Sequence, residues 1–310
     1  MIINVVDVPP IPIKVEGEVL KTEPPKDKWH ALRIILIIQG LATLMPWNMF
    51  INAQSYFQDY KLATTNGTDV MIKHYHDNFM SYVTICSMIP SVSFSAINTF
   101  VTRKSMASPM RMVAAKILMI ALLAVTIILA ALDTSEYMEV FFIITMLTIV
   151  LINSASSIFQ NSLFGISSIL PRQYITAVIF GSNFAGILTS VASIISIAIS
   201  SNARTSAFFY FSTAIFMLII ALITNRIFQK LPLYLYHKSQ VLKKSGHTEK
   251  KFRPPFWKIF KKIWVMCFNL WFIYTVTILN FPNVASQVKR INFPLKGKST
   301  FPSLFFFFNI

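Results

Sequence analysis

Uncharged polar side chains recur at helical spacing inside apolar stretches of the chain. Within residues 140–164, four of them fall at i, i+3, i+4 and i+7, on one face of a helix: Asn153, Ser156, Ser157 and Gln160. An amide donates and accepts hydrogen bonds, so Gln160 could pair with a nucleobase edge or a sugar hydroxyl. The pattern indicates either a polar-lined cavity for a neutral solute or hydrogen bonding between helices.

Two further stretches carry a polar face of the same kind. Residues 79–102 place Ser87, Ser91, Ser95 and Asn98 on one side. Residues 31–52 place Asn48 beside Leu44, Trp47 and Ile51. The indole of Trp47 could stack on a solute ring, although tryptophan is equally at home in the aromatic belt at a membrane surface.

Residues 174–200 carry small side chains instead. They recur at steps of three and four: Ser182, Gly186, Thr189, Ser193, Ser196 and Ser200. Small residues let helix backbones approach closely. We therefore expect Gly181, Ser182 and Gly186 to serve helix packing rather than ligand contact.

Patterns for catalysis, metal binding or a cofactor are missing from the sequence. It has no nucleophile elbow, phosphate-binding loop or zinc-ligand spacing. His74 and His76 stand in a polar segment, where we expect solvent around them rather than a metal ion. Cys86 and Cys267 both fall in apolar stretches and indicate no disulfide framework. We expect neither an enzyme nor a metal or cofactor site.

The elements that position these faces have the composition of membrane spans. The chain has 310 residues, of which 55% are hydrophobic and 13% charged, with a mean hydropathy of +0.59. Soluble domains carry about 25% charged residues, so an ordinary soluble enzyme or a disordered chain is excluded. About 20 apolar residues cross a bilayer as a helix. Seven spans are predicted: 31–52, 79–102, 112–132, 140–164, 174–200, 206–225 and 263–288.

The spans divide the chain into five segments. We expect a polar N-terminal segment over 1–30, a six-span bundle over 31–225, a basic loop over 226–262, the seventh span over 263–288 and an atypical tail over 289–310. The basic, aromatic stretch Phe256–Trp264 suits the membrane interface, with calmodulin binding as an alternative. The fold class expected is therefore an all-α integral membrane protein.

The distribution of Lys and Arg predicts the orientation in the membrane. Of the 28 such residues, 19 lie in the N-terminal segment and alternate loops, and seven lie on the opposite side. Cytoplasmic loops carry the excess of positive charge, so the N-terminus should be cytoplasmic. This opposes a seven-helix receptor, and it explains the net charge of +16 without a nucleic acid polymer as partner. The two remaining cations, Arg33 and Lys116, should extend to the membrane surface.

A glycosylation sequon bears on the outer side of the membrane, and the lack of acidic residues in the spans bears on the mode of transport. Asn66-Gly67-Thr68 is a glycosylation sequon in a predicted outer loop, so Asn66 is a candidate for modification. The predicted spans hold no Asp or Glu. Acids within spans commonly mark proton or cation coupling, so their absence favours passive movement of a solute.

Several motifs occur in an order typical of one family. They are Pro25-Lys-Asp-Lys-Trp-His30 before the first span, Gly40-Leu-Ala-Thr-Leu-Met-Pro-Trp-Asn48 within it, Cys86-Ser-Met-Ile-Pro90 in the second, Gln160-Asn-Ser-Leu-Phe-Gly165 in the fourth and Gly181-Ser-Asn-Phe-Ala-Gly186 in the fifth. With these motifs the chain resembles the equilibrative nucleoside transporters, solute carrier family 29, from about Pro25 to Arg290.

The resemblance implies a fold similar to the major facilitator superfamily, with eleven spans as six plus five. It implies equilibrative movement of nucleosides, and in some members nucleobases, by alternating access. We expect the plasma membrane as the location, because nothing near the N-terminus resembles a strong acidic dileucine signal for lysosomes, with an internal membrane as the alternative. Five residues match positions that line the family's cavity, namely Leu44, Trp47, Ile51, Met88 and Ser91, and Gln160 matches the amide that contacts the nucleobase.

The chain is shorter than this family. We expect the N-terminal six-helix half plus one helix of the second half, truncated after the seventh span. A non-transporting, truncated product of a nucleoside transporter gene is therefore the alternative function.

Overall fold

The computed structural model describes residues 13–15, 18–20, 24–63, 70–101, 109–134, 136–199, 202–246 and 256–280. Seven helices in this part are long and apolar enough to cross a membrane. They are α1 (Ala31–Asn52), α3 (Phe79–Val101), α4 (Pro109–Ala131), α5 (Met138–Ser167), α6 (Arg172–Ile199), α7 (Ala203–Phe228) and α9 (Phe256–Asn280). The predicted class, a helical membrane bundle with seven spans, is confirmed.

Short elements lie between and before these helices. A 3-10 turn covers Lys28–His30, a π-helical turn covers Tyr56–Lys61, and α2 (Val70–Asp77) and α8 (Pro232–Gly246) are short helices. Strands β1 (Ile13–Val15) and β2 (Glu18–Leu20) pair antiparallel, with Ile13 opposite Leu20.

The structure differs from the predicted basic loop at residues 226–262. Helix α7 continues to Phe228, α8 occupies the middle of the segment, and α9 begins at Phe256 rather than at 263. Lys258, Lys261 and Lys262 do not interrupt α9, since lysine is a good helix former and nothing between Phe256 and the apolar span breaks the helix. The segment 226–262 is basic, but most of its described residues are helical.

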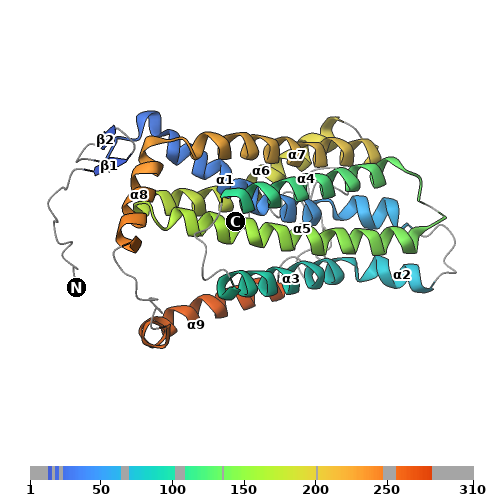
Figure 1. Cartoon of the computed structure of the whole chain (residues 1–310). Helices are drawn as coiled ribbons and strands as arrows, with labels where there is room; N and C mark the ends of the chain where they lie inside the picture. Colours follow the sequence, from blue (N-terminus) through green and yellow to red (C-terminus); the bar gives the residue numbers. More distant parts are fainter. Residues whose placement is uncertain are drawn as a thin grey trace, which may run out of the picture.

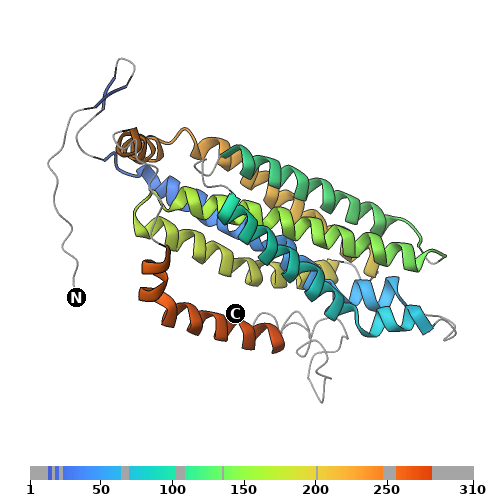
Figure 2. The same ribbon diagram turned by 60° about the horizontal axis from the view of Figure 1, so that its bottom comes forward.

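Helices α1 and α5 form the centre of the bundle (Figures 1 and 2). Helix α1 packs against α5, α6 and α7, and α5 packs against α3 and α4. In Figure 1 the green helix α5 lies between α4 and α3, with α7 beyond α4. This arrangement brings the polar faces that were predicted on α1, α3 and α5 together around one space.

The contact between α1 and α6 is especially close. A Cβ atom on Gly40 would lie 2.2 Å from the Val178 carbonyl oxygen, and one on Gly181 would lie 2.1 Å from the Ile37 carbonyl oxygen. No side chain fits at either position without moving a backbone. The Ser182 hydroxyl, also at this contact, lies 3.1 Å from the Gly40 carbonyl oxygen, to which it donates. Gly186 is buried further along α6.

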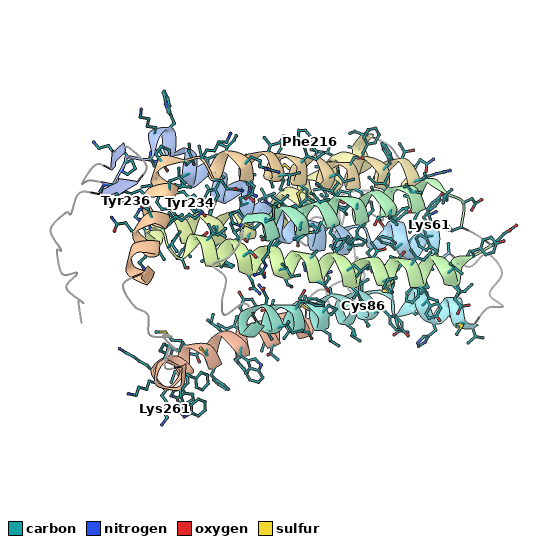
Figure 3. The ribbon with its side chains drawn as sticks, in the orientation of Figure 1. Lys61, Cys86, Phe216, Tyr234, Tyr236 and Lys261 are labelled. Carbon is teal, nitrogen blue, oxygen red and sulfur yellow. The ribbon has the colours of Figure 1, made fainter. Side chains whose placement is uncertain are left out.

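Many large apolar side chains are exposed on the outside of the bundle, as expected for helices long and apolar enough to cross a membrane. Phe216 is exposed on α7 (Figure 3), and large apolar residues are exposed on α3, α4 and α5 as well. Helix α9 makes almost no contact with the other described helices, and its described side chains, including Trp271, are nearly all exposed. By contrast, α8 is held to α7 by Tyr234, whose ring centroid lies 4.3 Å from that of Phe228.

Candidate functional site

A cavity of about 660 Å³ lies between α1, α3 and α5. This volume falls within the range of small-molecule sites, about 300–1,000 Å³. Its walls are Leu44, Trp47 and Asn48 from α1, Met88, Ser91, Val92, Ser95 and Ala96 from α3, and Asn153, Ser156, Ser157 and Gln160 from α5. None of these twelve side chains is charged. The cavity therefore suits a neutral solute with hydrogen-bonding groups.

Six of the seven residues expected at a binding site line this cavity: Leu44, Trp47, Asn48, Met88, Ser91 and Gln160. The seventh, Ile51, does not. It lies one turn beyond Asn48 and is only 1% exposed, because neighbouring side chains cover α1 at this level. Helical spacing correctly puts Ile51 on the same face of α1 as Trp47, but the cavity does not extend that far along the helix.

Several polar groups of the α5 wall are already bonded within the bundle. The Asn153 amide donates to the Ile149 carbonyl oxygen at 2.9 Å, and the Ser157 hydroxyl donates to the Asn153 carbonyl oxygen at 2.9 Å. The Ser156 hydroxyl donates to the Thr43 carbonyl oxygen at 2.5 Å and so ties α5 to α1. These three residues shape the wall, and their amide nitrogen and hydroxyl hydrogens are engaged within the bundle.

Gln160 and Ser91 differ from those residues. Neither side chain forms a hydrogen bond with any residue in the described part of the chain, and both are partly exposed to the cavity. The Asn48 amide nitrogen donates to the Leu44 carbonyl oxygen at 3.1 Å, and the Asn48 side-chain oxygen has no hydrogen-bond partner among the described residues. An amide, a hydroxyl and an indole at Trp47 thus offer donors, acceptors and a flat surface.

Val92 and Ala96 also line the cavity, and the sequence analysis missed them. Both are apolar and stand outside the polar stripe of α3. Val92 directly follows Ser91, and Ala96 directly follows Ser95. This position next to the polar stripe was the only signal in the sequence. A stripe of polar residues marks the centre of such a wall but not its width.

Lys116 lies where the sequence analysis did not expect it. It was predicted to extend to the membrane surface, but it is 0% exposed. Its Nζ donates to the Gln39 amide oxygen at 2.5 Å and to the Ala221 carbonyl oxygen at 3.2 Å, and it lies 4.5 Å from the centre of the Phe159 ring. These partners from α1, α7 and α5 replace water around the cation. The sequence did contain a sign of this buried position. Gln39 is a polar residue on the side of α1 opposite the stripe, and it could have been recognised as a partner for Lys116.

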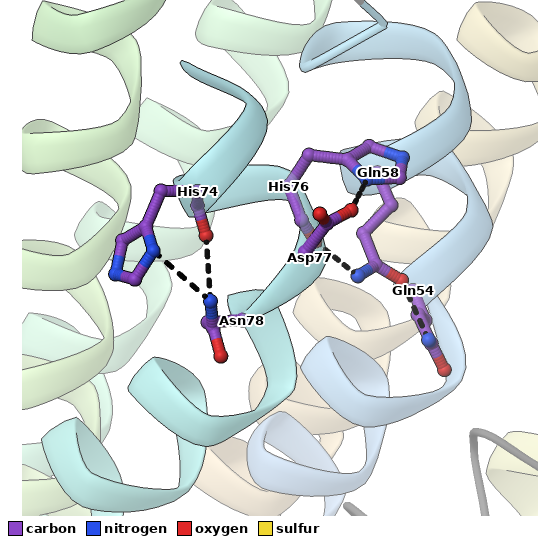
Figure 4. Close-up of polar contacts among 6 residues, drawn as sticks. All are labelled: Gln54, Gln58, His74, His76, Asp77 and Asn78. Carbon is purple, nitrogen blue, oxygen red and sulfur yellow. Dashed lines mark hydrogen bonds and ion pairs between the residues drawn. The ribbon is translucent and has the colours of Figure 1, made fainter. Parts of the chain in front are cut away.

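His74 and His76 lie on helix α2 rather than in a loop (Figure 4). His76 Nδ1 is 2.9 Å from an Asp77 carboxylate oxygen, and the Asn78 amide donates to the His74 carbonyl oxygen at 3.1 Å. The Gln58 amide donates to the His76 carbonyl oxygen at 2.6 Å, which connects α2 to the π-helical turn that follows α1. Within the described ranges, no group of His, Cys, Asp and Glu could hold a metal ion.

Asn66 and the tail beyond residue 280 lie outside the described residues, so their predicted roles stay predictions.

Comparison with known proteins identifies the family. Residues 146–254 match a family model described as "Nucleoside transporter". The human equilibrative nucleoside transporter 1 is 30% identical over 328 aligned positions, which cover 91% of this chain and 71% of the relative. The rat equilibrative nucleoside transporter 1 is 29% identical over 91% of this chain and 71% of the relative, and the human equilibrative nucleoside transporter 2 is 29% identical over 92% and 73%. The chain therefore belongs to the equilibrative nucleoside transporter family.

Proposed function

We propose that this protein moves nucleosides across a membrane down their concentration gradient. The observation that carries the proposal is the cavity between α1, α3 and α5, whose lining is uncharged and in which Gln160 and Ser91 have no partner in the described part of the chain. Family membership supports the same conclusion, since the relatives are named as equilibrative nucleoside transporters.

The side chains that line the cavity each have a role in this proposal. The Gln160 amide pairs with the edge of a nucleobase, because it offers one acceptor and two donors in a plane. Trp47 stacks on the base, and Ser91 and Asn48 accept or donate to the remaining polar groups. Leu44 and Met88 supply the apolar contact that excludes water. Nucleobases without the sugar satisfy part of this arrangement and are the weaker candidate substrate.

Transport in this proposal is not coupled to an ion. The described spans contain a single acidic residue, Glu139 in the first turn of α5, and no Asp or Glu lines the cavity. A coupled transporter needs a site for the driving cation or proton, and buried carboxylates are the usual ligands. Movement by alternating access then depends only on the gradient of the solute.

The proposed location is the plasma membrane, with the N-terminus in the cytoplasm. Support comes from the excess of Lys and Arg in the N-terminal segment and the alternate turns. The sequon at Asn66 then faces the outside, where glycosylation occurs. An antibody against a tag at Met1 should bind only after the cells are permeabilised.

Uptake of radiolabelled uridine and adenosine into transporter-deficient cells tests the function. We expect saturable uptake that is unchanged when sodium is replaced by choline. Gln160→Leu should raise the KM by about twofold to tenfold, the equivalent of one hydrogen bond of about 0.5–1.4 kcal/mol. Gln173→Leu, at an exposed position at the start of α6, is the matched control and should leave the KM unchanged. Surface expression without saturable uptake would contradict the proposal.

A further inference from the structure

A second hollow lies on the flank of the bundle, separate from the polar cavity. It has a volume of about 460 Å³ and runs between α3 and α4. Ala155 and Ile158 of α5 form its floor. No residue of α3 or α5 lines both hollows, because each helix turns one face to the polar cavity and another face to the hollow on the flank. We call this hollow the flank groove.

The flank groove exists because two helices pack on a third and not on each other. Helices α3 and α4 both pack against α5, but within the described residues they make almost no contact with each other. Ala114 and Ala155 line the gap between them. Their methyl groups are too short to fill it, so the gap stays open.

The wall of the flank groove faces outward from the bundle. Phe94, Ile97 and Leu118 line it and are large apolar residues that remain exposed, Ile97 by 54%. Since α3 and α4 are membrane spans by length and composition, these exposed side chains meet hydrocarbon. An acyl chain is the molecule available to fill an apolar groove at this depth.

A cation stands at one end of the flank groove. Arg111 lies in the first turn of α4, near the end of the span, where lipid headgroups are found. Its guanidinium donates to the Asn98 side-chain oxygen. No carboxylate within the described ranges forms an ion pair with it, and four of its five N–H donors have no partner there.

We propose that the flank groove binds a phospholipid, with the phosphate on Arg111 and one acyl chain over Ala155 between Phe94, Ile97 and Leu118. An arginine fork matches the oxygens of a phosphate, and the remaining wall matches a hydrocarbon chain.

Native mass spectrometry of the full chain in detergent tests this proposal. Three probes are added in turn: dioleoyl phosphatidylserine, dioleoyl phosphatidylcholine and dioleoylglycerol, which has the same acyl chains without a phosphate. We expect the two phospholipids to bind more tightly than dioleoylglycerol. Arg111→Gln should weaken phospholipid binding about tenfold, the value of a charge-assisted hydrogen bond, and leave dioleoylglycerol unaffected. Arg111→Lys should recover part of the loss.

A second variant tests the acyl site independently of the charge. Ala114→Phe fills the flank groove from an exposed position of α4 and should weaken binding of all three probes. Val125→Phe places the same side chain on an exposed position further along α4, and Arg226→Gln removes an exposed arginine from the last turn of α7. Both controls should bind the three lipid probes as the unchanged protein does. Each variant is accepted only if it elutes from a size-exclusion column as a single species.

Two results would overturn the proposal. One is equal phospholipid binding by the unchanged protein, Arg111→Gln and Ala114→Phe. The other is displacement of the lipid by millimolar inorganic phosphate, which would make Arg111 a site for a free anion. Neither result bears on nucleoside uptake, which is measured separately at the cavity between α1, α3 and α5.

Discussion

The two sides of α1 carry polar residues for opposite purposes. On one side, Gly40 allows α6 to approach until no Cβ fits, and Gln39 bonds to Lys116, Thr224 and the Ala221 carbonyl oxygen. On the other side, Trp47 and Asn48 face a cavity. We call these the sealed side and the cavity side of α1.

The difference lies in whether the polar groups are satisfied within the protein. On the sealed side the Gln39 amide has partners for both its oxygen and its nitrogen, and it is almost fully buried. Across the cavity from α1, Gln160 of α5 and Ser91 of α3 have no such partner among the described residues and remain partly exposed. Satisfied polar groups hold helices together, whereas open ones are available to a solute.

The largest expected effect comes from breaking the contact between α1 and α6. Gly181→Ala puts a Cβ within 2.1 Å of the Ile37 carbonyl oxygen, so the two backbones must separate. Overpacking of this kind costs about 1–3 kcal/mol, more where backbone must move. Thermal unfolding in detergent measures the loss. Gly165→Ala, at an exposed position of α5, should be neutral, and equal melting temperatures for the two variants would contradict the close contact.

Removing the buried cation should have the next largest effect. Lys116→Met leaves the Gln39 amide oxygen without its partner in a site that excludes water. An unsatisfied buried acceptor costs about 1–3 kcal/mol. We expect a lower melting temperature for Lys116→Met, partial recovery when Gln39→Leu is added, and no change for Lys230→Met at an exposed position. If the double variant were no more stable than Lys116→Met, the two side chains would not act as a pair.

The smallest expected effects distinguish Trp47 from Ile51. Trp47→Leu removes a flat surface from the cavity and should raise the KM for adenosine about threefold, with little change in melting temperature. Ile51→Val removes one buried methyl group and should cost about 0.5–1.5 kcal/mol of stability with the KM unchanged. Uptake kinetics and unfolding on the same two variants provide the measurement. A KM effect for Ile51→Val would extend the cavity one turn further along α1.

The sequence predicted the spans and the polar stripes because both are local. A span needs about 20 apolar residues, and a stripe needs only the period of a helix. Leu44, Trp47, Asn48, Met88, Ser91 and Gln160 were therefore identified before the helices were placed, and they line one cavity. The start of α9 was missed because a run of lysines between aromatic residues suits a helix as well as a loop.

By itself, the sequence determined which faces of α1, α3 and α5 are polar and that no charge lies among them. Only the tertiary structure decided where those faces meet, that Ile51 is covered, that Lys116 turns inward, and that a groove opens between α3 and α4. The physical reason is that periodicity fixes the direction of a side chain on its own helix. What the side chain meets depends on which helices pack beside it and how closely their backbones approach.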